Sequence, residues 1–232
     1  MNPIRKIIQK TGFDFHRHYT VPDKLIYLQT LNLQTVLDIG ANVGQFVKEI
    51  REQLPEAQIY SFEPIKECFD KLEENMKADK NFKAFNFALG DKDQNLEMHK
   101  SSYTPSSSIL DMAETHKTLF PHTKDSKPEQ ILVKKLDDIA TNLNLSKNIL
   151  IKIDVQGFED KVITGGIETF KKANVVIIEN SFVELYKNQS LFDDIYQKLK
   201  ILGFVYKGGL QEKLNKKTGQ IISEDSLFIR PQ

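Results

Sequence analysis

A short apolar run that closes with an acid and two glycines, VLDIGANVG at residues 36–44, sets the firmest limit on the fold. It predicts a buried strand over 35–39, and the pattern behind it predicts a helix over 45–54 that ends before a proline. Gly40 and Gly44 then lie in a strand-to-helix turn, where glycine permits unusual backbone angles and close approach. Gly44 would let the start of the helix pack closely on the strand. This arrangement is typical of the repeating unit of α/β proteins.

The same alternation of apolar runs and helical patterns continues along the chain. Further strands are predicted over 57–62, 82–89, 148–154 and 174–180 and in the late runs FVYKG and DSLFIRP, and the apolar pattern resumes after the middle segment with ILVKKL. Helices are predicted over 66–76, from Asp137, up to about Ala173 and over 191–202. Two polar segments interrupt the pattern. Residues 91–130, apart from an added strand in NLEMHKS, are expected to be a long loop, and the stretch between the last two strands an exposed turn.

We therefore expect one α/β domain, 1–232, with a mostly parallel sheet covered by helices on both faces. Residues 1–32 would form an N-terminal cap segment, and residues 33–232 the core. The N-terminal stretch MNPIRKIIQKTGFDF lacks the continuous apolar region of a signal peptide, and no run reaches the ~18 apolar residues of a membrane span.

Charge and cysteine content narrow the classes of partner and compartment. Lys+Arg and Asp+Glu both number 32, so no nucleic acid is expected as the main partner, because phosphates call for a basic surplus or a basic face. Cys68 is the one cysteine, which excludes an internal disulfide and a cysteine-based zinc site. This composition suits a cytoplasmic protein in a reducing environment.

Two acids frame the glycine turn. Asp38 precedes it, and Glu63 ends the next predicted strand, close to where an acid holds ribose hydroxyls in related folds. A dinucleotide turn would need a second closely spaced glycine where this chain has Ala41 and Asn42, and Asp38 would repel a pyrophosphate. The acid would instead attract the cationic amino-acid end of S-adenosylmethionine. The alternative, a glycine turn that binds nothing, stays open.

The order of the motifs resembles the FkbM family of S-adenosylmethionine-dependent methyltransferases over roughly residues 33–230. The motifs are VLDIGANVG, FEP, NFALGD, a serine stretch, LDD, IKIDVQGFEDKVITGG and DSLFI. The resemblance implies a class I, Rossmann-like methyltransferase fold, with a mostly parallel seven-stranded sheet and helices on both faces. It also implies O-methylation of a hydroxyl, typically on a sugar, a polysaccharide or a secondary metabolite.

The resemblance also assigns the donor site. The methionine end of S-adenosylmethionine would contact Asp38, Gly40, Asn42 and Gly44, the ribose would contact Glu63, and the adenine would lie near residues 86–89, including Asn86 and Ala88.

A second set of polar residues follows later strands. Asp154 and Glu179 each end a predicted strand, and neighbouring parallel strands would place them side by side. Asp154 would meet the donor's methionine portion or the acceptor hydroxyl, or only cap a helix. Two adjacent carboxylates can supply a catalytic base or share a divalent cation such as Mg²⁺, whereas Glu179 paired with a lysine would be structural.

Gln156 stands where the family commonly has glutamate. A carboxamide cannot take a proton, so it would bind an acceptor hydroxyl rather than act as a base. Glu159, three residues on, is expected to support the first turn of a helix.

Other polar residues carry weaker signals. His16 and His18 fit exposed positions on the cap segment, while His99, His116 and His122 could face the acceptor, although their spacing matches no compact metal motif. The serine stretch 106–108 would line the acceptor pocket or form a flexible tip. Tyr103 and Phe182 could stack on a sugar ring.

An O-methyltransferase is therefore the expected function, with a carbohydrate or small molecule as acceptor. An RNA methyltransferase would need a basic face and an added RNA-binding module. A non-catalytic S-adenosylmethionine-binding module is a further alternative, which Gln156 suggests. An NAD-dependent oxidoreductase would need the closely spaced glycine that the turn lacks.

Overall fold

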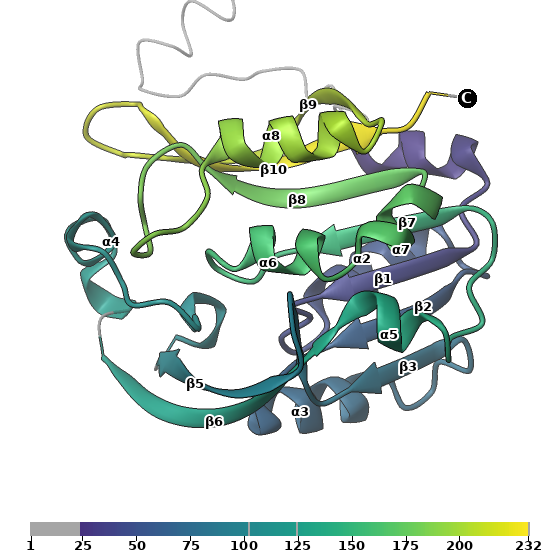
Figure 1. The fold of residues 1–232 in the computed structure, drawn as a ribbon, viewed down its shortest axis with the longest axis horizontal. Coiled ribbons are helices and arrows are strands. Elements are labelled where there is room, and N and C mark those ends of the chain that lie inside the picture. Colours follow the sequence, from purple (N-terminus) through teal and green to yellow (C-terminus); the bar gives the residue numbers. More distant parts are fainter. Residues whose placement is uncertain (1–23, 102, 124, 232) are drawn as a thin grey trace, which may run out of the picture.

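A seven-stranded sheet forms the centre of the protein (Figure 1). The computed structural model describes residues 24–101, 103–123 and 125–231. The strands lie in the order β3 (Phe82–Phe85), β2 (Gln58–Phe62), β1 (Thr35–Ile39), β7 (Ile149–Ile153), β8 (Val175–Ser181), β10 (Ile221–Ile229) and β9 (Val205–Leu214). Neighbouring strands from β3 to β8 are parallel, and β10 is antiparallel to β8 and β9. The predicted mostly parallel sheet is confirmed.

Helices cover both faces of this sheet. One face carries η1 (Lys24–Leu31), α2 (Gln45–Gln53) and α3 (Lys66–Met76), and the other carries α5 (Leu136–Ala140), α6 (Glu159–Thr164), α7 (Ile167–Lys172) and α8 (Phe192–Ile201). In β1, Val36 packs in the cluster of the first face and Leu37 in that of the second. Burial on both faces explains why the central strands are continuous apolar runs. No helix in the described ranges is long and apolar enough to cross a membrane.

The prediction of one strand over 82–89 was wrong. The run divides into β3 in the main sheet and β4 (Ala88–Gly90) in a second sheet of order β4-β6-β5. Asn86 lies at the break, and its amide donates hydrogen bonds of 2.9 Å to the carbonyl oxygens of Glu63 and Pro64. This side chain fixes the bend that takes the chain from one sheet to the other.

The middle segment is also more ordered than a loop. It contains β5 (Gln94–Ser101), η2 (Thr104–Ser106), α4 (Glu114–Leu119), η3 (Pro121–Thr123) and β6 (Ser126–Lys135). β5 and β6 pair antiparallel over eight residue pairs, and much of each strand is exposed. Such strands are rich in polar residues, which is why the sequence pattern indicated only the second half of β6, in ILVKKL, and assigned the first half to the loop. Figure 1 shows this sheet beyond the carboxyl ends of the main parallel strands.

Two further boundaries differ from the prediction. The polar stretch near the C-terminus mostly extends β9 and β10, which leaves a turn over 215–220. The helical stretch before Ala173 is two helices, α6 and α7, separated by Gly165 and Gly166. A Cβ atom on Gly165 would lie 1.8 Å from the carbonyl oxygen of Gly90 in β4. This close approach holds the second sheet against the main domain.

Gly165→Ala should therefore destabilise the fold by at least about 3 kcal/mol, because the new methyl group meets backbone that cannot move aside. Gly219→Ala is the matched control. Gly219 has a φ of 74° but no neighbour within 4 Å of its Cβ position, so it should cost only about 1 kcal/mol of backbone strain. Urea unfolding of both variants measures the difference, and equal losses would contradict the packing argument.

Candidate active site

The glycine turn after β1 has the left-handed backbone that its sequence suggested. Gly40, Asn42 and Gly44 have φ values of 84°, 48° and 91°. A Cβ on Gly40 would lie 1.9 Å from the carbonyl oxygen of Asp154, so glycine lets the turn meet the end of β7. A Cβ on Gly44 would lie 2.9 Å from Leu72. Gly44 thus permits close packing of α2 on α3, and not on a strand as expected.

Glu63 ties the end of β2 to this turn. One carboxylate oxygen accepts the backbone N–H of Asn42 and the other that of Ile65, both at 2.8 Å. The side chain is buried, and this burial raises the pKa of Glu63 from 4.5 to about 7 despite the two hydrogen bonds. A carboxylate has about four acceptor positions, so two remain for a ligand.

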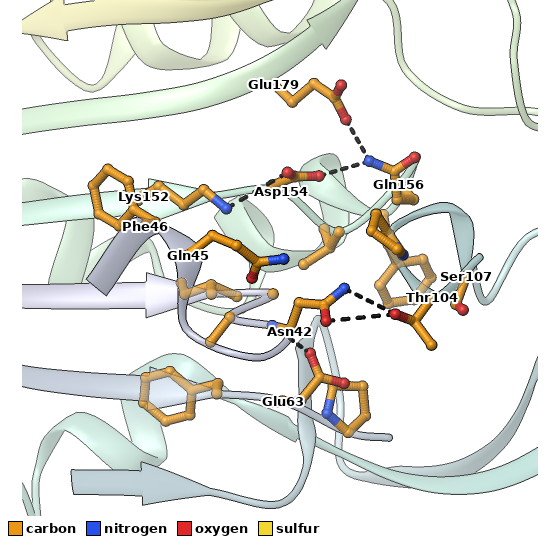
Figure 2. Close-up of a pocket in the computed structure, with 18 of the residues that line it drawn as sticks. Asn42, Gln45, Phe46, Glu63, Thr104, Ser107, Lys152, Asp154, Gln156 and Glu179 are labelled. Carbon is orange, nitrogen blue, oxygen red and sulfur yellow. Dashed lines mark hydrogen bonds and ion pairs between the residues drawn. The ribbon is translucent and has the colours of Figure 1, made fainter. Parts of the chain in front are cut away.

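The predicted neighbours Asp154 and Glu179 do lie side by side, and the side chain of Gln156 joins them (Figure 2). Its amide nitrogen donates to Asp154 at 2.6 Å and to Glu179 at 2.5 Å. Its amide oxygen accepts a 2.8 Å hydrogen bond from the hydroxyl of Tyr186. Both amide hydrogens are therefore used within the protein, which leaves only the oxygen for an acceptor hydroxyl.

The backbone around Gln156 is unusual for this residue type. Its φ is 54°, and Gly157 follows with a φ of 98°. The hydroxyl of Ser108 donates a 2.6 Å hydrogen bond to the carbonyl oxygen of Gln156, and Glu159 accepts the N–H of Gly157 at 3.1 Å. Non-glycine residues with positive φ persist where the surroundings hold them, often at functional sites. Glu159 thus supports the turn that precedes α6, whereas the first turn of the helix was the expected place.

The two carboxyl groups differ in how tightly they hold a proton. Burial, and then the nearby charge of Asp154, raises the pKa of Glu179 to about 8. Burial alone would raise the pKa of Asp154 as well, but Lys152, Lys213 and the Gln156 amide outweigh it and keep that pKa below its usual value. The pair thus combines an ionised carboxylate with a group suited to proton transfer near neutral pH.

Three residues at this centre were not predicted. Lys213 on β9 contacts Glu179 at 2.5 Å, and Tyr186 comes from the loop after β8. Lys152 on β7 lies 3.5 Å from Asp154 and 4.0 Å from Asp38. Only Lys152 left a signal in the sequence, as a charged residue inside the apolar run ILIKI.

A pocket of about 520 Å³ opens at the carboxyl ends of the parallel strands and contains this centre. Ligands of open α/β sheets bind at this edge. Of the predicted site residues, those that line it are Gly40, Asn42, Glu63, Ala88, Asp154, Gln156 and Glu179. Three others are absent from the lining: Gly44 packs on α3, Asn86 supports the turn after β2, and Asp38 is fully buried behind the pocket.

Asp38 is nevertheless unusual. One carboxylate oxygen accepts a 3.1 Å hydrogen bond from Ser61, and the other has no hydrogen-bond partner. Burial raises the pKa of Asp38, although Lys152 opposes the effect. A buried acceptor without a partner next to a pocket suggests a missing ligand or water.

The middle segment supplies one wall of the pocket. Its lining residues are Met98, Tyr103, Thr104, Pro105, Ser107 and Ile109. The Thr104 side chain contacts that of Asn42 at 3.4 Å, so this wall reaches the glycine turn. Ser107, from the predicted serine stretch, faces the pocket, whereas Phe182 is outside the lining.

The histidines lie elsewhere. His99, His116 and His122 are outside the pocket lining, and His16 and His18 lie outside the described residues. His99 pairs with Asp111 at 3.1 Å, and His116 is buried against Thr123 with its pKa lowered by burial to about 4. Among the residues that the structure describes, no group of three or more His, Cys, Asp or Glu could hold a metal ion.

The sheet order, the glycine turn and the pocket at the carboxyl edge define the class I methyltransferase fold. A solved structure described as a S-adenosylmethionine-dependent methyltransferase from Listeria monocytogenes has this fold, with a TM-score of 0.50 at 9% identity, over 91% of this chain and 94% of that one. The sequence also matches the family described as Methyltransferase FkbM domain over residues 38–206. The chain belongs to the FkbM family of S-adenosylmethionine-dependent methyltransferases.

Two relatives have named methyltransferase activities. The 2-O-methyltransferase NoeI of Sinorhizobium fredii is 29% identical over 160 residues, which are 66% of this chain and 66% of that protein. Methyltransferase 1 of Beauveria bassiana is 27% identical over 181 residues, which are 73% of this chain and 71% of its own length.

The pocket residues fit S-adenosylmethionine. The turn at Gly40 lines the pocket with its backbone, and Glu63 keeps acceptor positions free for ribose hydroxyls. Ala88 and Leu89 provide apolar surface for a base. Asp154 and Glu179, at the opposite end of the pocket from Ala88, supply negative charge that suits the donor's ammonium and sulfonium groups.

Gln156→Glu should destabilise the protein by about 2 kcal/mol at pH 8, because a second ionised carboxylate would then lie beside Asp154, with no amide donor between Asp154 and Glu179. The loss should shrink at pH 5, where a proton can take the place of the amide hydrogen, or with millimolar Mg²⁺. Urea unfolding at each condition measures this.

Gln189→Glu is the control for that variant. The Gln189 amide oxygen accepts the backbone N–H groups of Leu185 and Tyr186, so a carboxylate suits the same position. This variant should keep its stability at pH 8. If Gln156→Glu also kept its stability there, the bridging role of the amide would be wrong.

Proposed function

We propose that this methyltransferase transfers the methyl group of S-adenosylmethionine to a hydroxyl oxygen of a sugar, a polysaccharide or a similar hydroxylated metabolite. The observation that carries the proposal is the paired carboxylate centre of Asp154 and Glu179 beside a polar pocket wall. Gln211, Lys213, Ser223 and Asp225 of the β9–β10 hairpin line that wall. Such side chains suit a neutral polyol, and the name of the relative NoeI includes 2-O-methylation.

The donor half of the pocket would hold S-adenosylmethionine in an extended pose. Glu63 would accept the ribose hydroxyls, Ala88 and Leu89 would contact the adenine, and the glycine turn would approach the methionine portion. Asn86 would act indirectly, through the turn that carries Glu63. The bound donor supplies a methyl group attached to a sulfonium sulfur. After transfer, this sulfur is a neutral thioether.

In the acceptor half, Glu179 would take the proton of the reacting hydroxyl. The methyl carbon–sulfur bond breaks as the carbon–oxygen bond forms in line, and the hydroxyl proton goes to Glu179. Asp154 would stay ionised beside the donor's positive charge. Gln156 would hold the two carboxylates in place, and its oxygen would remain available to the acceptor.

Mg²⁺ does not fit this centre as the side chains lie. The amide of Gln156 and the ammonium of Lys213 already occupy the oxygens that a shared cation would need. We therefore propose no step through a metal ion.

The charge of the pocket bears on the alternatives. Its described lining has six acids against two lysines: Glu49, Glu63, Asp154, Glu179, Glu224 and Asp225 against Lys152 and Lys213. A polyanion such as RNA would be repelled.

We also propose a single catalytic domain in a reducing, cytoplasmic setting, in line with the buried free thiol of Cys68.

A pH series tests the ribose contact. The folded protein holds the Glu63 proton more tightly than the unfolded chain, so this group stabilises the fold below pH 4.5 and loses that effect as the pH rises through about 7. Ribose hydroxyls prefer the ionised form, so affinity for S-adenosylhomocysteine should rise about tenfold from pH 6 to pH 8. In Glu63→Gln that rise should disappear, and calorimetry that finds it unchanged would exclude the contact.

Calorimetry and product analysis test the function itself. S-adenosylmethionine and S-adenosylhomocysteine should bind with micromolar affinity, and NAD should not. Neutral methyl glycosides and polyols, incubated with the donor with and without Mg²⁺, should gain one methyl group on oxygen, as seen by mass spectrometry and NMR. Donor binding with methylation of nitrogen, or of RNA instead, would overturn the proposed acceptor class.

A further inference from the structure

The ammonium of Lys152 is a buried positive charge in the donor half of the pocket. Lys152 lies in β7, where the other four residues are apolar and buried, and only 9% of Lys152 is exposed. Its side chain passes over the ring of Phe46, with the nitrogen 5.7 Å from the ring centre. A buried lysine is costly unless its charge is well paired, so this one requires an explanation.

Asp154 and Asp38 attract Lys152 strongly enough to raise its pKa despite burial, but neither forms a short hydrogen bond with it. Its nitrogen lies 3.5 Å from an oxygen of Asp154 and 4.0 Å from one of Asp38. Charge-assisted hydrogen bonds are shorter, about 2.7–2.9 Å. The Asp38 oxygen at 4.0 Å has no hydrogen-bond partner at all. The cation and its acids are close enough to attract but too far apart to satisfy one another.

The same ammonium faces the pocket. Lys152 lines it together with Gly40, Gln45 and Phe46. Figure 2 shows the lysine nitrogen pointing toward Asp154, above the Gln45 side chain. The amino-acid end of the donor would lie in this region, since the other end of the donor site is formed by Glu63 and Ala88.

We propose that Lys152 binds the carboxylate of the donor's methionine portion while Asp154 binds its ammonium. This inference rests on the proposed pose of S-adenosylmethionine. An α-amino acid carries an ammonium and a carboxylate on one carbon. Its carboxylate can therefore meet the ammonium of Lys152 while its ammonium meets the carboxylate of Asp154. Binding would replace one long contact with two short charge-assisted hydrogen bonds.

A purely structural role is the alternative. Lys152 would then only offset the charges of Asp38 and Asp154, and its loss would weaken the binding of any ligand that contacts this region. The two roles separate when ligands with and without the carboxylate are compared on one protein.

The experiment measures dissociation constants by calorimetry for S-adenosylhomocysteine, for its decarboxylated analogue and for 5′-methylthioadenosine, which lacks the whole amino-acid portion. The wild type should bind S-adenosylhomocysteine about 10- to 100-fold more tightly than the decarboxylated analogue, as expected for one hydrogen-bonded ion pair. In Lys152→Gln this preference should fall to about one, with the affinity for 5′-methylthioadenosine retained. Lys152→Arg, which keeps the cation, should keep most of the preference.

Lys213→Gln is the matched control, because it removes another lysine from the same pocket without touching the carboxylate. It should leave the preference intact. If Lys152→Gln fails to fold, the wild-type preference and the Lys152→Arg variant still decide, since no preference in the wild type overturns the inference. An unchanged preference in folded Lys152→Gln also overturns it. Failure of the wild type to bind S-adenosylhomocysteine would instead overturn the donor pose itself.

Discussion

The donor turn and the carboxylate centre depend on one backbone contact in which no side chain fits. At Gly40 the turn after β1 meets the carbonyl oxygen of Asp154 at the end of β7, where a Cβ would be 1.9 Å away. The contact brings a segment near residue 40 against one near residue 154. Both polar sites therefore belong to one pocket, and their separation is fixed by the register of two paired strands.

Charge balance is the second requirement of this site. Asp38, Asp154 and Glu179 lie at or near the carboxyl ends of the adjacent strands β1, β7 and β8. The positive charges that balance them are Lys152 of β7 and Lys213 of the distant β9. The amide of Gln156 adds two hydrogen-bond donors without adding charge. Net negative charge remains in the pocket, which suits a donor with a sulfonium and an ammonium group and opposes an anionic acceptor.

Local sequence patterns predicted the features of the site that depend on the parallel strands and their connections. The adjacency of Asp154 and Glu179 follows from the βαβ connection between their strands, and Gly40 was recognisable from its place after an apolar strand. Tyr186 and Lys213 could not be predicted, because each reaches the site from a loop or hairpin far along the chain. The first half of β6 was assigned to a loop because it is polar and exposed. The break at Asn86 depends on hydrogen bonds to the turn after β2.

The second sheet is connected to the main domain mainly through β4, which pairs with β6 and packs against Gly165. β4 pairs with β6 over only three residue positions, yet β5 and the segment after it supply one whole wall of the pocket. Replacement of that insert would change this wall of the pocket, together with its contacts from Thr104 to Asn42 and from Ser108 to Gln156. The shape of the pocket thus depends on a module outside the main sheet, while the positions of Asp154 and Glu179 depend on the pairing of β7 with β8.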